Sequence, residues 1–235
     1  MLQKIEAKQR HYSDFGWLRT YWLFSFSDYY DPGNIQFGAL RVFNDDVVQP
    51  LTGFPTHPHH EMEVITIPLS GEITHADSMG NESLIKAGDV QRMSAGTGLT
   101  HSEYNLGDES AHFCQIWIYP DIAGLKPSYD QRRYDSEQWE NTLFPVASGQ
   151  GIKGVVGIHV DATIYRSEMD SGKILDYTAN DKRRLFLYVT KGDISVEGIS
   201  LSEGDQLRID ELNNMQIKAL ADSHIIMIDV PSCKG

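Results

Sequence analysis

The chain has 235 residues, a length that allows one large β domain or two domains of about 100 residues each. Its 33 acidic and 20 basic residues give a formal net charge of −13, which repels phosphate backbones and argues against direct binding to nucleic acid. Hydrophobic residues make up 40% of the chain, and no apolar run approaches the roughly 20 residues that span a bilayer. The composition is therefore typical of a soluble globular protein, and we expect no binding to membranes.

Two further features indicate the cellular compartment. Residues 1–15 carry charged side chains throughout and no apolar block, so they do not resemble a secretion signal, and we expect a cytoplasmic protein. Cys114 and Cys233 lie far apart and outside any CxxC pair. This spacing favours reduced thiols over a disulfide framework or a zinc knuckle.

The pattern of residues along the chain predicts an all-β protein. Aromatic and β-branched residues concentrate in segments that clusters of Gly, Pro, Asn or Asp separate, and we predict strands at 17–26, 63–69, 112–119, 185–189 and 224–230. Helical periodicity is scarce. The one candidate is a short stretch at 136–139, which Asp135 or Ser136 could cap. The segment 120–150, with its prolines and glycines, is typical of a connection between two halves.

A diverged repeat links the two halves. In the first half, a Gly-Glu turn at Gly71 is followed by a Gly-Asp turn at Gly88, and in the second half, Gly192-Asp193 is followed by Gly204-Asp205. The spacing differs, with 17 positions from Gly71 to Gly88 but 12 from Gly192 to Gly204. The second copy contains no HxH pair.

Residues that could bind a metal concentrate between positions 56 and 105. In the run His57-Pro58-His59-His60-Glu61-Met62-Glu63, an extended strand places His57, His59, Glu61 and Glu63 on one face, because strand side chains alternate with a period of two. The same face continues as Ile65, Ile67 and Leu69, so we expect it to point into a core. Buried ionisable side chains need partners, and a metal ion satisfies several at once.

A second cluster, His101-Ser102-Glu103, repeats this spacing. Together the clusters offer three imidazole nitrogens and a carboxylate oxygen, a set that suits Fe, Mn, Ni, Cu, Co or Zn and lacks the thiolates of structural zinc sites. Spacing alone does not decide between Glu63 and Glu103 as the carboxylate ligand.

The remaining candidates have simpler interpretations. We expect five other histidines to be solvated or hydrogen-bonded without a metal: His11, His75, His112, His159 and His224. The run Ala95-Gly96-Thr97-Gly98 is predicted to be a tight turn that delivers His101, since no helix signal or lysine follows as in a phosphate cradle. The run from Asp77 to Asn81 has the composition of a hairpin turn. The sequence does not decide whether Tyr12, Trp17, Tyr21 and Trp22 line a pocket or fill the core.

The motifs resemble those of a known family. The pattern Gly53-(x)3-His57-x-His59-(x)3-Glu63-(x)7-Gly71 resembles the first cupin motif, and Gly88-(x)5-Ser94-x-Gly96-(x)4-His101-(x)3-Asn105 resembles the second. Within the cupins, the chain is similar to the pirin family over five runs: His57-Pro58-His59, Asp77-Ser78-Met79-Gly80-Asn81, Gly88-Asp89-Val90-Gln91, Met93-Ser94-Ala95-Gly96-Thr97-Gly98 and His101-Ser102-Glu103.

The resemblance implies two antiparallel β-sandwich barrels of the cupin type, a bicupin. It implies a metal-binding barrel over 1–125, a linker with at most short helices over 126–150, and a degenerate barrel without metal over 151–235. It also implies four metal ligands: His57, His59, His101 and Glu103. The choice of Glu103 agrees with geometry, because Glu63 lies about 13 Å beyond His59 along an extended strand. Glu61 and Glu63 become candidate groups around the ligands or in the pocket.

Two functions follow from the resemblance. The first is that of a metal-dependent dioxygenase that cleaves flavonols such as quercetin with O2, in which Glu103 is both a ligand and the catalytic base, and in which one divalent ion, Fe²⁺ by expectation, binds the substrate. The second is that of a regulatory or redox-sensing protein that acts through protein partners. The sequence identifies no partner surface, and we expect a monomer.

Overall fold

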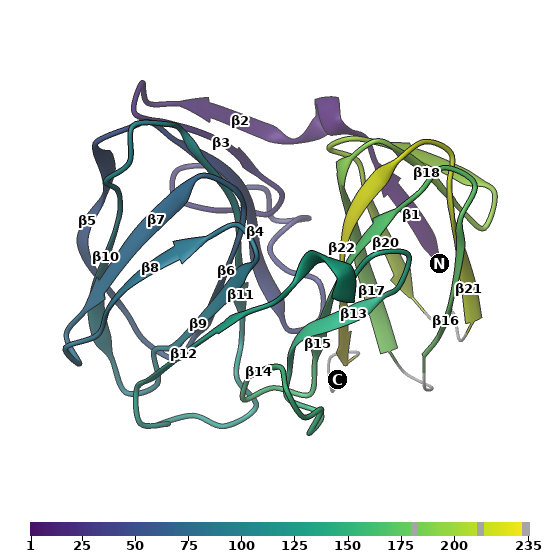
Figure 1. Cartoon of the computed structure of the whole chain (residues 1–235). Coiled ribbons are helices and arrows are strands. Elements are labelled where there is room, and N and C mark those ends of the chain that lie inside the picture. Colours follow the sequence, from purple (N-terminus) through teal and green to yellow (C-terminus); the bar gives the residue numbers. More distant parts are fainter. Residues whose placement is uncertain (180–182, 211–213, 232–235) are drawn as a thin grey trace.

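The structure, a computed structural model, describes residues 1–179, 183–210 and 214–231, so Cys233 lies outside it. Four β-sheets form two barrels that lie side by side, with the first half of the chain on the left of Figure 1 and the second on the right. No helix in these ranges is long and apolar enough to cross a membrane. The chain is thus an all-β bicupin, as the sequence predicts.

The N-terminal barrel consists of a four-stranded and a seven-stranded sheet. The four-stranded sheet has the order β5 (Thr52–His59), β10 (Leu99–Asn105), β7 (Glu72–Asp77) and β8 (Glu82–Lys86). The seven-stranded sheet has the order β12 (Ser128–Arg133), β9 (Asp89–Ser94), β6 (Glu63–Ser70), β11 (Ala111–Ile118), β4 (Leu40–Val48), β3 (Leu18–Trp22) and β2 (His11–Asp14).

The C-terminal barrel repeats this plan. Its four-stranded sheet has the order β16 (Ile174–Thr178), β21 (Asn214–Ala219), β18 (Asp193–Val196) and β19 (Ile199–Ser202). Its seven-stranded sheet has the order β1 (Leu2–Ile5), β20 (Gln206–Asp210), β17 (Arg183–Lys191), β22 (Ser223–Pro231), β15 (Thr163–Met169), β13 (Phe144–Ser148) and β14 (Val156–Gly157). Four of the five predicted strands are β6, β11, β17 and β22, and the fifth ends early, since β3 stops at Trp22.

Within the described residues, helical structure is limited to two short 3-10 turns, Ala7–Gln9 and Ser136–Gln138. The second is the predicted short helix, and Asp135 is its N-cap residue. The segment 126–150 holds this turn together with β12, which pairs with β9, and β13, which pairs with β15. The first strand, β1, pairs with β20 of the second barrel. Domain boundaries at 125 and 150 stay a prediction.

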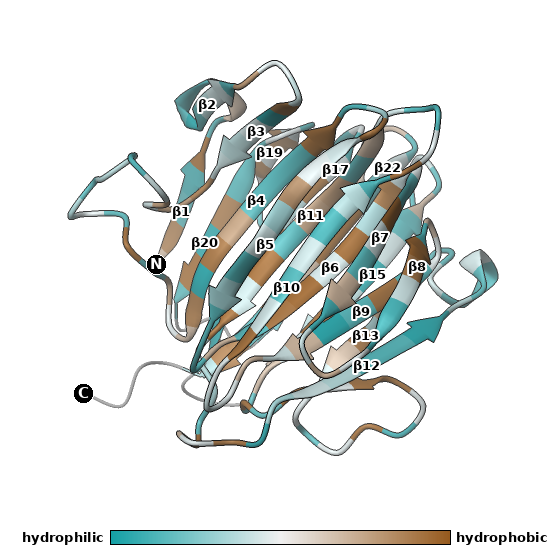
Figure 2. Ribbon diagram, turned by 90° about the vertical axis from the view of Figure 1, so that its left-hand side faces the viewer, coloured by the Kyte–Doolittle hydropathy of each residue, from teal (hydrophilic) through white to brown (hydrophobic). Residues whose placement is uncertain are grey.

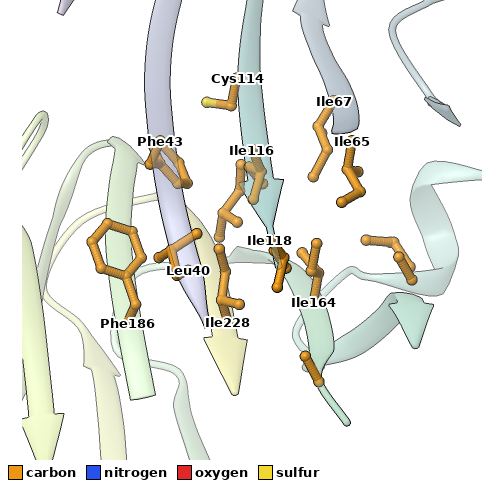
Figure 3. Close-up of a cluster of buried hydrophobic side chains, with 14 of the residues drawn as sticks. Leu40, Phe43, Ile65, Ile67, Cys114, Ile116, Ile118, Ile164, Phe186 and Ile228 are labelled. Carbon is orange, nitrogen blue, oxygen red and sulfur yellow. The ribbon is translucent and has the colours of Figure 1, made fainter. Parts of the chain in front are cut away.

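The main core lies between the two barrels. Figure 3 shows Phe43, Ile65 and Ile116 from the first seven-stranded sheet near Phe186 and Ile228 from the second. These side chains are at most 1% exposed. Along strands such as β4 and β11 in Figure 2, hydrophobic and hydrophilic residues alternate, because one face of these strands packs in this core and the other faces the interior of the N-terminal barrel.

The interiors of the barrels differ in chemistry. The C-terminal barrel is filled by aliphatic side chains such as Leu187, Ile217 and Met227. The N-terminal barrel instead buries polar and ionisable groups, among them Asp46, His75, Gln91, His101 and Glu103. Burying such groups is unfavourable unless they acquire partners, so the first barrel is the one built around a site.

One prediction about strand geometry is wrong. Residues 57–69 do not form a continuous strand with one inward face, because β5 ends at His59 and β6 begins at Glu63 in the opposite sheet. Glu61, with φ of 49°, adopts the left-handed conformation that allows the chain to turn between the sheets. As a result, Ile65 and Ile67 pack between the barrels, whereas Thr66 on the other face of β6 reaches the interior, where it contacts Glu103.

The predicted repeat has a structural counterpart. Gly71 separates β6 from β7 and Gly192 separates β17 from β18, with φ of 71° and 79°. In the Gly-Asp turns, Asp89 accepts a hydrogen bond from the Lys86 N–H at 2.8 Å, and Asp205 accepts one from the Ser202 N–H at 3.0 Å. The longer spacing in the first copy belongs to the β7–β8 hairpin.

Candidate metal centre

Three histidines converge at the inner face of the four-stranded sheet. The pairing of β5 with β10 places His57 directly opposite His101, and His59 lies two residues further along β5 on the same face. One ring nitrogen from each of the three lies within 4.8 Å of the other two. This is the cluster that the sequence predicts from its two i, i+2 pairs.

Glycines at two positions allow this convergence. A Cβ atom at Gly53 would lie 2.2 Å from the Glu103 carbonyl oxygen, so β5 can approach β10 this closely only without a side chain there. The register shifts between His101 and Glu103, which is the mark of a β-bulge. Ahead of β10, the Gly98 N–H bonds to the Ala95 carbonyl at 2.9 Å, and Gly98 has φ of 124°. The predicted tight turn before His101 is thus confirmed.

The ring nitrogens are arranged for metal binding. His57 Nδ1 lies 2.8 Å from the Pro55 carbonyl oxygen, which can only accept, so the proton sits on Nδ1 and Nε2 keeps its lone pair. His101 Nε2 is buried and has no hydrogen-bond partner among the described residues. A buried nitrogen without a partner is unfavourable unless it binds something, and a metal ion is the ligand for three such imidazoles.

Electrostatics keeps two of the histidines neutral. Burial, followed by the neighbouring imidazoles, lowers the pKa of His59 to about 3. Burial, followed by His57 and His75, lowers the pKa of His101 to about 3 as well. Only the neutral imidazole can donate a lone pair to a metal. Both side chains are therefore in their ligand form over the whole physiological range of pH.

Glu103 lies close to His101 and His75 and is 1% exposed. Thr66 Oγ1 donates a hydrogen bond to one carboxylate oxygen at 3.3 Å, and Gln115 Nε2 donates to the other at 2.7 Å. Glu103 forms a second close group with His101 and His75, again within 4.8 Å, and falls outside the group of His57, His59 and His101. A carboxylate oxygen can accept such a hydrogen bond and still bind a metal.

The two other glutamates of the first motif point elsewhere. Glu63 is 1% exposed and accepts hydrogen bonds from Ser94 Oγ at 2.9 Å and from His159 Nδ1 at 3.2 Å. Glu61 accepts a hydrogen bond from the Gly124 N–H at 3.0 Å. Neither belongs to a group of close potential ligands within the part of the chain that the structure describes. Both glutamates instead bind groups outside the histidine cluster.

His75 is a site residue that the spacing argument missed. It is 0% exposed and hydrogen-bonded, to Asp77 at 3.2 Å and to His101 at 3.4 Å. A hydrogen-bonded histidine was expected, but not one in contact with a potential ligand. The signal was present, because His75-x-Asp77 has the same alternate spacing as His101-x-Glu103.

An aromatic slot of about 210 Å³ opens beside the centre. The aromatic rings of Trp17, Trp22, Phe26 and Phe54 line it, together with the polar side chains of Asn44, Asp46 and Gln115. Trp17 and Trp22 thus line a pocket, whereas Tyr12 and Tyr21 line a different cavity between the barrels. Through Gln115, the slot is in contact with Glu103.

The polar lining of the slot contains an acid with an unusual pKa. Burial, followed by the charges of Asp45 and Glu103, raises the pKa of Asp46 from 3.8 to about 8. Asp46 Oδ1 and Asn44 Oδ1 have no hydrogen-bond partner among the described residues. At neutral pH, the lining of the slot therefore includes an uncharged carboxyl group and an amide.

Comparison with known proteins assigns the family. Residues 5–118 match the family model described as Pirin, and residues 145–230 match the one described as the quercetinase C-terminal cupin domain. The chain is 41% identical to a putative quercetin 2,3-dioxygenase of Zymomonas mobilis over 97% of both chains, and 39% identical to the quercetin 2,3-dioxygenase of Escherichia coli K12 over 98% of this chain and 99% of that one. The chain belongs to the pirin family.

Solved pirin structures agree with this assignment. The crystal structure of YhhW from Escherichia coli superposes with a TM-score of 0.95 at 38% identity and covers 100% of both chains. A structure of the bacterial pirin YhhW in complex with nickel(II) superposes with a TM-score of 0.92 at 37% identity and covers 99% of this chain and 100% of that one. The histidine cluster of this pirin and the nickel complex of its relative support a candidate site for a divalent metal.

Proposed function

We propose that this pirin is a metal-dependent dioxygenase of the quercetin 2,3-dioxygenase type, with His57, His59, His101 and Glu103 as the ligands of a single ion. The observation that carries the proposal is the link between the aromatic slot and the candidate ligand Glu103, which runs through the hydrogen bond from Gln115. A planar phenolic substrate fits walls made of aromatic rings, and its oxygen atoms need polar partners in the lining of the slot. Relatives named for quercetin cleavage support the choice of substrate.

The residues have distinct parts in this proposal. A bound divalent ion would act as a Lewis acid toward the oxygen atoms of the substrate. His57, His59 and His101 hold the ion and present no proton to it. Glu103 is the catalytic base that takes the proton of the substrate 3-hydroxyl, because a carboxylate beside the ligands is in reach of that group. Thr66 and Gln115 keep the Glu103 carboxylate oriented.

The slot determines how a flavonol would enter. At about 210 Å³ it is smaller than the pockets that enclose a whole drug-sized ligand, so it accepts one ring system and leaves the rest toward the ion. Uncharged Asp46 can donate a hydrogen bond to a phenolic oxygen, and Asn44 Oδ1 can accept one from a hydroxyl group.

The test is oxygen-dependent cleavage of quercetin by the metal-loaded protein. We expect loss of the near-ultraviolet absorption of quercetin together with consumption of O2. Phe26→Ala, which removes one wall of the slot, should raise KM for quercetin, and Tyr30→Ala is the matched control, because Tyr30 is 74% exposed and lies outside the slot. If protein with a full metal complement neither bleaches quercetin nor consumes O2, the proposal is wrong.

The identity of the ion is part of the same proposal, with Fe²⁺ as our choice. Protein purified without a chelating tag is analysed for its elements and then assayed after reloading with Fe, Mn, Ni, Cu, Co or Zn. Highest activity with iron, and iron in the isolated protein, are expected; iron-loaded protein less active than another metal form contradicts the choice. The regulatory alternative and the cytoplasmic location stay predictions.

A further inference from the structure

A chain of three buried side chains runs from a hairpin turn to the candidate metal centre. Asp77 Oδ2 lies 3.2 Å from His75 Nε2, and His75 Nδ1 lies 3.4 Å from His101 Nδ1. The side chains of Asp77 and His75 are 0% exposed, and His101 is 1% exposed. The side-chain contacts themselves are therefore shielded from solvent.

The strand register places the three together. In the pairing of β7 with β10, Asp77 lies opposite His101 and His75 lies opposite Glu103, so all four side chains are on the same face of the sheet. Tyr129 packs on the other side of His75, with ring centroids 4.9 Å apart and an angle of 31° between the planes. The imidazole of His75 is thus fixed by packing as well as by its two hydrogen bonds.

The turn fixes Asp77 as an acceptor. The Met79 N–H, the Asn81 N–H and Asn81 Nδ2 donate to its carboxylate at distances from 2.9 to 3.1 Å. A carboxylate that accepts several N–H groups is held in its ionised form, which has no proton to give. His75 Nε2 must then be the donor toward Asp77.

The position of the other protons follows in sequence. A neutral imidazole carries one N–H, so His75 Nδ1 is an acceptor. Of the two Nδ1 atoms that face each other, the one on His101 must therefore carry the proton. This leaves the lone pair of His101 on Nε2, the buried atom without a partner among the described residues.

We infer that Asp77 and His75 are positioning residues that fix the tautomer of His101 and direct its Nε2 lone pair to the metal. The inference rests on the metal site of the proposed function. A carboxylate and an imidazole behind a ligating histidine orient its ring and make it more basic. The hairpin turn Asp77–Asn81 between β7 and β8 thus contributes to the site through a relay of two hydrogen bonds, from His75 to Asp77 and from His101 to His75.

The direct test is the tautomer of His101 in the metal-free protein. Two-bond ¹H–¹⁵N spectra of ¹⁵N-histidine-labelled protein at pH 8 should show a proton on Nδ1 of His101. Asp77→Asn keeps the three hydrogen bonds that the turn donates to Oδ1 and loses the one from Asn81 Nδ2 to Oδ2. It presents an amide N–H to His75, which reverses both tautomers and puts the proton of His101 on Nε2. His75→Phe removes the acceptor, whereas His75→Asn restores one through its amide oxygen.

Metal affinity gives a second readout. Competition with a chelator for Ni²⁺ should show binding weakened by about 10- to 100-fold in Asp77→Asn and in His75→Phe, with recovery of most of the loss in His75→Asn. The matched control is Asp89→Asn, since Asp89 also caps a turn of this barrel, at the Lys86 N–H, and lies outside both groups of potential ligands. Its Ni²⁺ affinity should equal that of the wild type.

The outcomes separate this inference from the proposed function. An Nδ1-protonated His101 together with wild-type Ni²⁺ affinity in folded Asp77→Asn protein overturns the relay, and so does equal affinity in His75→Phe and His75→Asn. If Asp77→Asn fails to fold, the two His75 variants decide the question. A wild type that binds no Ni²⁺ contradicts the metal site, whereas the tautomer of the metal-free protein still tests the relay.

Discussion

His101 is the residue at which both groups of potential ligands meet. It belongs to the group with His57 and His59 and to the group with His75 and Glu103, and its Nδ1 atom contacts His75. The side chain is 1% exposed, so the contact with His75 is shielded from solvent. The loss of this imidazole should affect metal binding more than the loss of any exposed histidine nearby.

Replacing His101 with alanine is expected to abolish metal binding, because it removes one ligand and leaves a cavity behind the other two. Metal content per chain, measured by elemental analysis after purification without a chelating tag, checks this. His60→Ala is the matched control, since His60 is an exposed neighbour of His59 outside the cluster. An unchanged metal content in His101→Ala would mean that the ion binds elsewhere.

The buried acid Asp46 makes the stability of the metal-free protein depend on pH. Its pKa is about 8 in the folded protein, against an ordinary value of 3.8. The unfolded chain releases this proton near pH 4, whereas the folded chain keeps it until about pH 8. The contribution of Asp46 to the free energy of unfolding is therefore complete below pH 4 and is lost progressively as the pH rises to 8.

Asp46→Asn should remove this dependence. The free energy of unfolding of the wild type should fall relative to that of the variant by up to about 1.4 kcal/mol per pH unit between pH 4 and 8. Denaturant titrations of both metal-free proteins at several pH values provide the measurement. For Asp108→Asn, at an exposed position, the difference from the wild type in the free energy of unfolding should be the same at every pH. A constant difference for Asp46→Asn as well would contradict a buried neutral carboxyl group.

At the scale of the element, the pairing of β5 with β10 is what aligns the ligands. His57 faces His101 only because the bulge shifts the register before Glu103. Gly53 lies next to this shift, where its missing side chain allows the strands to meet. The geometry of the site thus depends on a residue that provides no ligand.

Gly53→Ala is expected to push β5 away from β10. The new methyl group would lie 2.2 Å from the Glu103 carbonyl oxygen, and such overpacking lowers stability by about 1–3 kcal/mol. Metal affinity should fall as well, because His57 and His59 move with the strand. Chemical denaturation and chelator competition measure the two effects. Gly157→Ala, whose added atom meets nothing within 4 Å, should leave both unchanged, and wild-type values for Gly53→Ala would disprove the need for close approach.

The elements also explain how much of the site could be predicted from the sequence. Alternation within a strand is a local property, so the pairs His57-x-His59 and His101-x-Glu103 were recognisable without a structure. The break at Glu61 was not, because a glutamate in the left-handed conformation has no sequence signature like that of glycine. The continuous face from His57 to Leu69 was wrong for this reason.

The role of His75 was missed for a different reason, although its spacing to Asp77 is visible in the sequence. Its contact with His101 depends on the pairing of β7 with β10, which is set by tertiary structure. The repeat makes the point clear, because His75 lies four positions after Gly71, and the position four after Gly192 is Val196, in the aliphatic interior of the second barrel. The fold was predictable to the level of two all-β barrels, but not the sheet to which β1 belongs.

At the scale of the whole molecule, the two barrels share their largest core. The rings of Phe186 and Phe43, from opposite sheets, lie 5.1 Å apart, and both side chains are 0% exposed. Each barrel therefore buries one face of its seven-stranded sheet only against the other. The barrels should unfold together in a single transition.

Phe186→Ala tests this coupling. Removing a buried phenylalanine should lower the free energy of unfolding by about 3–5 kcal/mol. The unfolding transition should shift by the same amount whether it is followed by a signal from the metal centre or by far-ultraviolet circular dichroism. Leu84→Ala, on the exposed side of β8, should change little, since Leu84 is 42% exposed. Two separate transitions in the Phe186→Ala protein would show that the barrels unfold independently.

The pairing of β1 with β20 has a consequence for synthesis on the ribosome. Leu2–Ile5 leaves the exit tunnel long before its partner, Gln206–Asp210, is translated. Every strand that carries a potential ligand has emerged well before then. The nascent chain can thus complete its histidine cluster before the second barrel covers the apolar outer face of the N-terminal seven-stranded sheet. A chaperone that shields aliphatic surface would meet this chain at that stage.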